Sequence, residues 1–213
     1  MAQWLNTTFY GLDSSMFALM NSIKCSFLTG FSEFFAILGD GGLSFIIASI
    51  VLMLFTKTRR MGFCMLLAIA VGALFTNITL KPLVARPRPY THREFVGYWQ
   101  EVGASIESAR SFPSGHTTSC TAFVVAFFLM YKKKWSWVAL LGALCMAFSR
   151  VYLIVHYTTD VVAGLIVGSV GAIIAYYLTK LIYRFLSRFY DNKLVNLFFT
   201  FGLVELWQKI FNK

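Results

Sequence analysis

The chain has 213 residues, of which 58% are hydrophobic and 17% aromatic, and its mean hydropathy is +0.67. Soluble domains are about 45–50% apolar, so this excess along most of the chain argues against an ordinary soluble domain and for a membrane protein. The net charge is +10, but the cations fall mainly between apolar runs and in the tail. We interpret them as interfacial anchors rather than as a surface for nucleic acid.

The first 42 residues allow two interpretations. Ser14–Leu38 is apolar but is interrupted by Lys24, Gly30 and Glu33. It is either a sixth span or a pair of interfacial or re-entrant helices that ends at residues 39–42. The interruptions favour the second interpretation for an N-terminal segment of residues 1–42. No basic stretch followed by an apolar run opens the chain, so no cleavable signal peptide is predicted.

Apolar runs between residues 43 and 185 predict the membrane core of the chain. A span needs about 20 residues, so the first and third runs are short. With the N-terminal segment they predict an all-α membrane bundle of about five to six transmembrane helices. The runs are Leu43–Phe55, Gly62–Leu80, Thr117–Tyr131, Trp135–Val155 and Val161–Ile182.

Residues 186–213 are predicted to form a cytoplasmic tail. Val195–Phe211 mixes Phe, Leu and Trp with Glu205 and Lys209, which is typical of an amphipathic helix on a membrane surface.

The loops carry a charge asymmetry that orients the bundle. Helix parity places two connections and the tail on one side, and their cations make that side cytoplasmic by the positive-inside rule. The Lys81–Pro113 connection and residues 149–160 then face outward. The cations are Lys57, Arg59 and Arg60, then Lys132, Lys133 and Lys134, then Arg184, Arg188, Lys193, Lys209 and Lys213.

The outward side also gathers side chains suited to phosphate chemistry. Ionisable groups at membrane depth are costly, so they indicate function by default. Several fixed cations would hold an anion, and two imidazoles with a carboxylate could do nucleophilic and acid work. These residues are Lys81, Arg88, Arg110, Arg150, His116, His156 and Asp160.

His156 and Asp160 are spaced four residues apart, which would bring them together on one face of a helix. A carboxylate that accepts a hydrogen bond from one imidazole nitrogen fixes the tautomer and leaves the other nitrogen able to attack phosphorus. The alternative is an ordinary His–Asp pair that closes a helix end.

Two further stretches could bind an anion. In Phe112–Thr118, Pro113 sets a turn, Gly115 permits close approach of a ligand, and amides at a helix start attract anions, so His116 there could protonate a leaving oxygen. Lys81–Pro89 is too rich in proline to continue as a regular helix, and it could curl around a phosphate. The alternatives are a capped helix with an interfacial histidine and a solvated loop.

Together these three stretches resemble the type 2 phosphatidic acid phosphatase superfamily. Its first motif, Lys-x6-Arg-Pro, matches Lys81 to Arg88-Pro89, and its second, Pro-Ser-Gly-His, matches Pro113 to His116. Its third, Ser-Arg-x5-His-x3-Asp, matches Ser149-Arg150 through His156 to Asp160. All three occur in order and at full spacing.

The resemblance implies roles for these residues. His156 would attack phosphorus to form a phosphohistidine, Asp160 would orient it, and His116 would protonate the leaving oxygen and then activate water. Lys81, Arg88, Arg150, Ser114 and the Gly115 backbone would hold the phosphoryl group. Ser149 would only support Arg150, and Arg86 falls in the variable stretch of the first motif. Arg93 and Arg110 would bind a headgroup or remain solvated.

The resemblance also implies a multi-pass protein of the cell membrane, without metal or cofactor, whose site faces the extracytoplasmic side. The substrate would be a lipid phosphate among membrane lipids. The chain is similar to bacterial undecaprenyl diphosphate phosphatases, and phosphatidylglycerophosphate or phosphatidate is the alternative substrate. A membrane phosphotransferase would use the same residues, whereas a vestigial site is disfavoured by the complete set. The sequence does not predict an oligomeric state.

Overall fold

The computed structural model describes residues 1–99, 109–131, 133 and 136–206. These residues form helices and loops without a β-strand, which confirms the predicted all-α fold. The helices are α1 (Ala2–Thr8), α2 (Tyr10–Ser22), α3 (Ser26–Leu38), α4 (Leu43–Met53), α5 (Arg59–Ala73), α6 (Lys81–Val84), α7 (Gly115–Tyr131), α8 (Trp137–Tyr152), α9 (Thr158–Leu186) and α10 (Lys193–Thr200). Shorter segments are the 3₁₀ turns η1 (Asp40–Gly42), η3 (Pro89–Thr91), η4 (Val96–Tyr98) and η6 (Ser187–Phe189), and the π-helix η2 (Leu74–Leu80).

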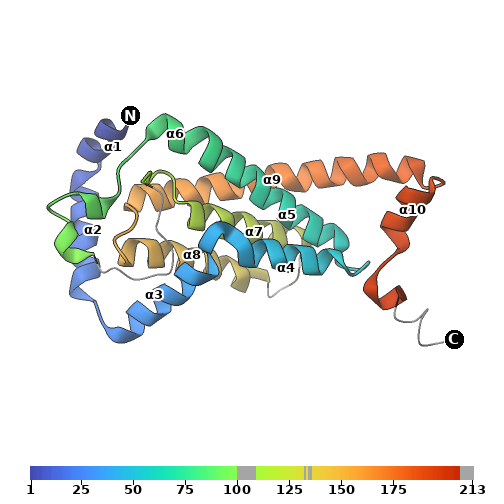
Figure 1. The fold of residues 1–213 in the computed structure, drawn as a ribbon, viewed down its shortest axis with the longest axis horizontal. Helices are drawn as coiled ribbons and strands as arrows, with labels where there is room; N and C mark the ends of the chain where they lie inside the picture. The colour runs from blue at the N-terminus through green and yellow to red at the C-terminus, as the bar shows by residue number, and fades with distance from the viewer. Residues whose placement is uncertain (100–108, 132, 134–135, 207–213) are drawn as a thin grey trace.

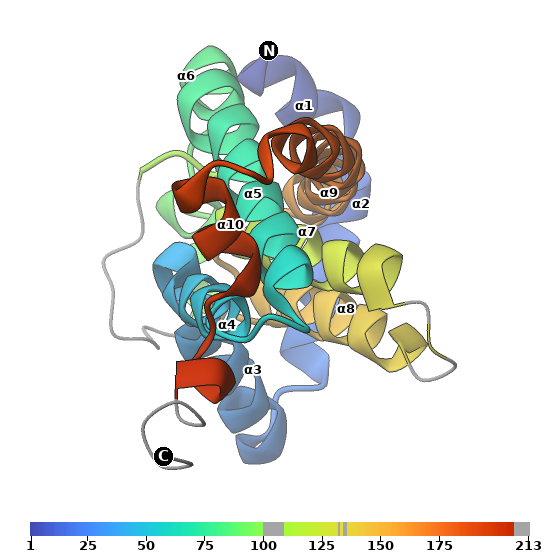
Figure 2. The same ribbon diagram turned by 90° about the vertical axis from the view of Figure 1, so that its right-hand side faces the viewer.

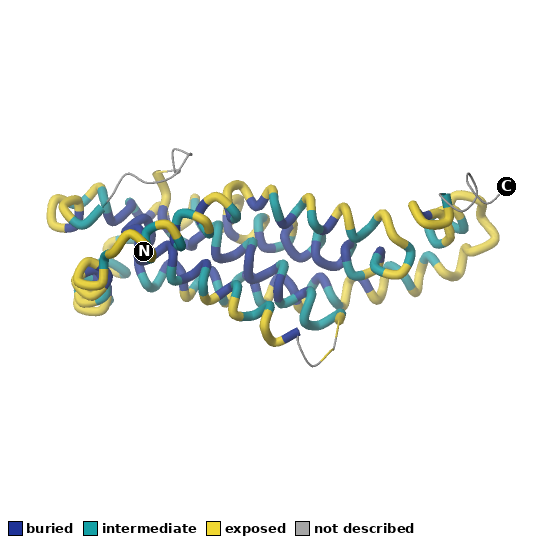
Figure 3. The backbone as a smooth tube through the Cα atoms, turned by 90° about the horizontal axis from the view of Figure 1, so that it is seen from below, coloured by how far each residue is buried: buried dark blue, intermediate teal, exposed yellow. Residues whose placement is uncertain are grey.

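The bundle is elongated, and helices cross both of its ends. Figure 1 shows α5, α7, α8 and α9 running along the long axis, with α2 across one end and α10 across the other. Seen along that axis, α5, α7 and α9 lie together beside α4 and α8 (Figure 2). Buried positions follow the inner sides of these helices, while outer turns and the two ends are exposed (Figure 3).

Helix α9 packs closely on α7 and α5 because most of its buried residues are glycine or alanine. A Cβ at Gly168 would lie 2.6 Å from the Thr118 carbonyl oxygen, and one at Gly171 would lie 3.2 Å from the Gly72 nitrogen. Small residues of this kind let helix backbones approach each other within a membrane. The opposite side of α9 is an exposed apolar stripe of Val162, Ile166, Val170, Ile173, Tyr177 and Leu181, as expected for a surface that faces lipid.

Two helical runs among the described residues are long and apolar enough to cross a membrane, namely Arg59–Thr91 and Thr158–Phe189. Helices α3 and α4 could form a third span, but they are bent by 43° at a break, which is also the geometry of a re-entrant loop. Helices α7 and α8 are apolar but shorter, at 17 and 16 residues. The predicted membrane bundle is therefore confirmed, with five apolar elements along its axis if all of them cross.

The N-terminal segment does not contain one helix over Ser14–Leu38. Helix α2 ends at Ser22 and α3 begins at Ser26, so the helix is interrupted at Lys24. Helix α2 crosses the end of the bundle, whereas α3 packs on α8 (Figure 1). The break falls where the sequence loses its continuous apolar run.

The prediction that helix stops at Lys81 was wrong by one turn. The π-helix η2 leads directly into α6, which continues to Val84, and Ala85 then adopts a left-handed conformation with φ of 48°. Pro82 lies at the start of α6, where its missing N–H costs little. The wider turns of η2 immediately before it change the hydrogen-bond register, a feature common near functional sites.

The predicted amphipathic helix Val195–Phe211 is interrupted within its described part. Helix α10 ends at Thr200, Phe201 is extended, and a short helical turn resumes at Leu203. The break is held by buried Arg59, which donates hydrogen bonds to the carbonyl oxygens of Phe198 and Phe201. After the break, the amide of Leu203 donates to the Leu54 carbonyl oxygen at 3.0 Å instead of to the preceding helix.

Other helix starts differ from the prediction by a few residues, because the helices extend into polar residues that an apolar run does not include. Helix α5 begins at Arg59 instead of Gly62, α7 at Gly115 instead of Thr117, and α9 at Thr158 instead of Val161. Some predicted features lie outside the described residues, namely Lys132, Lys134, Trp135, Lys209, Lys213 and the end of the tail helix.

Candidate active site

His156 and Asp160 lie together, but not on one helix as the sequence suggested. Residues 153–157 form a loop between α8 and α9, and Asp160 occupies the first turn of α9. The Nδ1 atom of His156 lies 3.5 Å from Asp160 Oδ2. The backbone amide of Tyr157 donates to that same oxygen at 3.0 Å, so Asp160 both caps α9 and faces the histidine.

The loop that carries His156 is anchored on Arg150. Arg150 is buried at the end of α8, and its carbonyl oxygen accepts hydrogen bonds from the amides of Val155 and His156, each at 3.3 Å. Its Nε donates to the Ser149 hydroxyl at 3.4 Å. Arg150 therefore shapes the backbone under His156.

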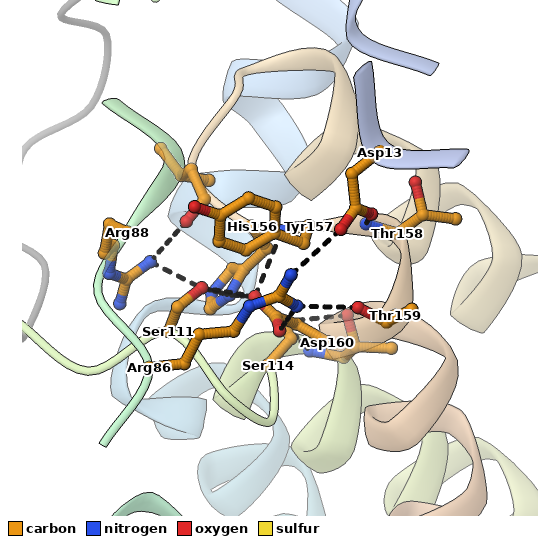
Figure 4. Close-up of polar contacts among 12 residues, drawn as sticks. Asp13, Arg86, Arg88, Ser111, Ser114, His156, Tyr157, Thr158, Thr159 and Asp160 are labelled. Atoms are coloured by element: carbon orange, nitrogen blue, oxygen red, sulfur yellow. Dashed lines mark hydrogen bonds and ion pairs between the residues drawn. The ribbon is translucent and has the colours of Figure 1, made fainter. Parts of the chain in front are cut away.

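Arg88 contacts the other side of the His156 ring. Its Nη1 lies 3.0 Å from His156 Nε2 and donates to the Val155 carbonyl oxygen at 2.9 Å (Figure 4). A guanidinium has donors only, so Nε2 must be the acceptor and the ring proton must lie on Nδ1, toward Asp160. The geometry thus selects the neutral tautomer whose Nε2 lone pair can attack an electrophile.

His116 and His156 line one cavity of about 400 Å³ at the end of the bundle where α7 and α9 begin. Lys81, Asn77, Gly115, Asp40 and Ser119 also line it. A Cβ at Gly115 would lie 3.7 Å from Lys81 Nζ, so the absence of a side chain there leaves room beside the cation. Two imidazoles and an ammonium group therefore surround a space that would hold a phosphoryl group.

Ser114 lies beside the cavity rather than among the described residues that line it. It is wholly buried, and its hydroxyl accepts a hydrogen bond from Thr117 at 3.0 Å. Its amide donates to the Asp160 carbonyl oxygen at 3.0 Å. These contacts tie the start of α7 to the start of α9, which fixes His116 relative to His156.

Sequence reasoning missed three residues that surround Asp160. Ser111 donates to Asp160 Oδ2 and lies 3.4 Å from His156 Nδ1. Arg86, considered only a variable position of the first motif, is wholly buried and binds Asp160 Oδ1 at 2.8 Å. Asp13 of α2 binds the same guanidinium at 2.9 Å (Figure 4). The available signal was Asp13 itself, a carboxylate inside a largely apolar segment.

Burial changes the pKa values of two side chains in this cluster, Asp13 and Tyr157. Burial raises the pKa of the Asp13 carboxyl, and the adjacent Arg86 guanidinium opposes that rise. Burial likewise raises the pKa of the Tyr157 phenol well above its ordinary value.

Arg93 and Arg110 are exposed and lie outside the cavity lining. Within the described part of the chain, no three His, Cys, Asp or Glu side chains gather as a metal site would require.

Comparisons with known proteins agree with the fold and the motifs. Residues 61–203 match the family model of the PAP2 superfamily. An undecaprenyl-diphosphatase of Sulfolobus acidocaldarius is 28% identical over 75% of this chain and 74% of its own. A lipid A 4'-phosphatase of Porphyromonas gingivalis is 28% identical over 74% of this chain and 68% of its own. The crystal structure of Aquifex aeolicus LpxE superposes with a TM-score of 0.62 at 28% identity, covering 77% of this chain and 94% of that one.

Proposed function

The chain belongs to the PAP2 superfamily of lipid phosphatases, and on that premise we propose that it hydrolyses undecaprenyl diphosphate through a phosphohistidine at His156. The observation that carries the mechanism is the position of His156 between Asp160 on its Nδ1 side and Arg88 on its Nε2 side. A histidine held in this way keeps its proton toward a carboxylate that stabilises the cation formed on attack, and its Nε2 lone pair becomes available when Arg88 turns to the phosphoryl oxygens.

In the first half of the reaction, His156 Nε2 forms a bond to phosphorus and the bond from phosphorus to the leaving oxygen breaks. His116, which lines the same cavity, gives its proton to that oxygen. The products are a phosphohistidine and lipid monophosphate, or a lipid alcohol when the substrate is a monophosphate.

In the second half, a water molecule attacks phosphorus and the bond to Nε2 breaks. His116, now neutral, takes the proton of the water. Inorganic phosphate leaves, and both histidines return to their starting protonation states. One imidazole thus acts first as acid and then as base, as the reversal of roles between the two steps requires.

The cations supply electrostatic stabilisation. Lys81 lines the cavity, and Arg88 lies against Nε2, so phosphoryl oxygens entering the cavity can replace Nε2 as acceptors of the Arg88 N–H groups. Arg150 is the third cation that we propose to stabilise the charge of the phosphoryl group. Gly115 leaves space for the phosphoryl group beside Lys81. Donors placed before the reaction are effective because they need no reorganisation as charge develops.

The proposed substrate and location rest on the membrane character of the site. Ile46, Leu66 and Ile69 line the cavity beside its polar groups, which suits a phosphate attached to a lipid. The charged turn between α4 and α5 lies at the other end of the bundle (Figure 1). With that end cytoplasmic by the positive-inside rule, the site faces the extracytoplasmic side of the cell membrane.

The test is phosphate release by the purified full chain in detergent. Undecaprenyl diphosphate, phosphatidylglycerophosphate, phosphatidate and lipid A are compared as substrates, and undecaprenyl diphosphate should have the highest kcat/KM. Preference for another lipid would overturn the substrate and keep the mechanism. His156→Ala should abolish turnover and the acid-labile phosphoenzyme, and release at the parent rate would contradict the mechanism.

A phosphotransferase would use the same phosphohistidine, so acceptor dependence separates the two outcomes. Hydrolysis should proceed without any added alcohol or lipid acceptor. A strict requirement for an acceptor, with the phosphate recovered on it, would replace hydrolysis by transfer.

A further inference from the structure

Arg86 lies between two carboxylates from distant parts of the chain. Its Nη1 is 2.8 Å from Asp160 Oδ1 in α9, and its Nη2 is 2.9 Å from Asp13 Oδ2 in α2. The side chains of all three residues are almost completely inaccessible to solvent (Figure 4). A buried charge is costly unless it is paired and hydrogen-bonded, so this cluster holds together only as a unit.

The remaining contacts of Arg86 leave its guanidinium little freedom. Nε donates to Asn6 Oδ1 of α1 at 2.7 Å, and Nη1 also donates to Thr159 Oγ1 at 2.6 Å. The guanidinium carbon lies 3.6 Å from the centre of the Tyr157 ring. A planar fork with fixed donor directions and an aromatic face beneath it suits arginine and does not suit lysine.

The two oxygens of Asp160 have separate partners as a result. Oδ1 accepts from Arg86, whereas Oδ2 accepts from Ser111 and from the Tyr157 amide and faces His156 Nδ1. Rotation of the carboxylate would break contacts at both oxygens at once. The orientation of His156 therefore depends on a guanidinium that does not touch the cavity.

From these contacts we infer that Arg86 is a positioning residue of the active site, held in turn by Asp13 and Asn6 of the N-terminal helices. It fixes the carboxylate of Asp160 so that Oδ2 meets His156 Nδ1. This inference rests on the proposed function, because it concerns the same histidine. Helices α1 and α2 would then help to position the active site, in addition to any contact that they make with the membrane surface.

The charge arrangement supports the same role. Without Arg86, Asp13 and Asp160 would be two buried carboxylates without the cation that now joins them. Asp13 is further held by the Thr158 amide, which donates to its Oδ1 at 3.1 Å. Helix α2 is thus tied to the start of α9 through both a guanidinium and a backbone amide.

The experiment compares Arg86→Gln and Arg86→Lys with the parent enzyme, using full-length protein in detergent and the best lipid phosphate of the panel. Substitution of groups that orient a metal-binding histidine typically costs about 10–100-fold in activity, and we expect a similar loss for a group that orients a nucleophilic histidine. Arg86→Gln should lower kcat and the rate of phosphoenzyme formation by that factor, with KM changed less than about threefold. Arg86→Lys restores the charge without the fork and should recover only part of the loss.

Arg59→Gln is the matched control for the cost of removing a buried arginine. Arg59 is 8% exposed, and its side chain donates hydrogen bonds to the carbonyl oxygens of Met53, Phe198 and Phe201 at the far end of the bundle. This variant should lower the melting temperature while leaving kcat unchanged. An equal loss of kcat in Arg59→Gln and Arg86→Gln would overturn the inference, since the loss would then follow stability alone.

Asp13→Asn keeps the experiment decisive if Arg86→Gln does not fold. It preserves the shape of the side chain and removes one of the two carboxylates that hold Arg86, so kcat should fall by severalfold at unchanged KM. Full kcat in Asp13→Asn, or in a folded Arg86→Gln, would refute the positioning role while the proposed function stands. An inactive parent enzyme on every lipid phosphate would instead refute the proposed function and the inference with it.

Discussion

Gly39 lies directly against the ring of His116. A Cβ at Gly39 would be 2.7 Å from His116 Cδ2 and 2.7 Å from Met146 Cε. Gly39 ends α3 with a φ of −90°, which any residue can adopt, so the constraint is space and not backbone conformation. The end of α3 therefore forms the wall that places the proposed acid in the cavity.

Gly39→Ala should displace His116 and slow catalysis. The end of Met146 is flexible and can move, but the added methyl group must also push the imidazole away from the leaving oxygen. A misplacement of about 1 Å can cost about 10²-fold, so kcat should fall toward that level while the protein still folds. Steady-state phosphate release, with size-exclusion chromatography to check folding, measures this effect.

Gly11→Ala provides the control, because a Cβ at Gly11 would meet no atom within 4 Å. Its kcat should equal that of the parent. If Gly39→Ala also kept the parent kcat, His116 would not need the position that the structure gives it.

Catalysis should depend on pH through His116. A group that donates a proton must carry it at the start of the step, so kcat/KM, which reports the steps up to the phosphoenzyme, should fall as pH rises and the imidazolium is lost. The pH profile of kcat/KM on a lipid phosphate measures this decline. His116→Asn should be slow and should lack the alkaline decline, whereas a flat profile in the parent enzyme would contradict the role of His116 as the acid.

Arg88→Lys should reduce kcat strongly although the charge is kept. Lysine carries all its donors on one nitrogen and has no planar fork, so it should serve the phosphoryl oxygens poorly while it also holds the Val155 carbonyl oxygen. Loss of one such donor costs about 10²–10³-fold in kcat, which phosphate-release kinetics would detect.

Arg93→Lys is the matched substitution for Arg88→Lys, made in an exposed arginine of the same connection. Its kcat and KM should stay within about twofold of the parent, well below the 10²-fold cost of a catalytic donor. A large rise in KM for Arg93→Lys would instead favour the headgroup contact considered from the sequence.

Much of the bundle follows from the sequence, because a lipid-facing helix must be apolar over nearly its whole length. The runs that became α7 and α9 were located to within a few residues of their starts at Gly115 and Thr158. Their first residues were missed since the helices extend into the polar loops that carry His116 and His156. The first turns of α7 and α9 thus belong to the site, and their polar residues cannot be recognised as helix from an apolar run.

The candidate site was less predictable in its supporting contacts. The motif spacing identified His156, Asp160 and Arg88, which the structure brings together. It gave no indication that Arg86 and Asp13, which are far apart in the chain, would meet behind Asp160. Such a pairing depends on how α2 crosses the end of the bundle, and a helical period or a local motif does not report that placement.

Gly168→Ala should destabilise the bundle, because the position faces the backbone of α7. A Cβ there would lie 2.6 Å from the Thr118 carbonyl oxygen and 2.7 Å from Thr121 Cβ, and backbone atoms cannot move aside as a flexible side chain can. Overpacking of this kind costs about 1–3 kcal/mol. Thermal unfolding in detergent should show a lower melting temperature.

Gly30→Ala tests the opposite situation in α3. A Cβ at Gly30 would meet no atom within 4 Å, and alanine is favoured over glycine in a helix by about 0.5–1 kcal/mol. Its melting temperature should therefore stay level or rise.

Gly168→Ala should also lower kcat, because separation of α9 from α7 strains the hydrogen bond between the Ser114 amide and the Asp160 carbonyl oxygen. Equal melting temperatures for the two variants would mean that α9 is not held by close contact with α7.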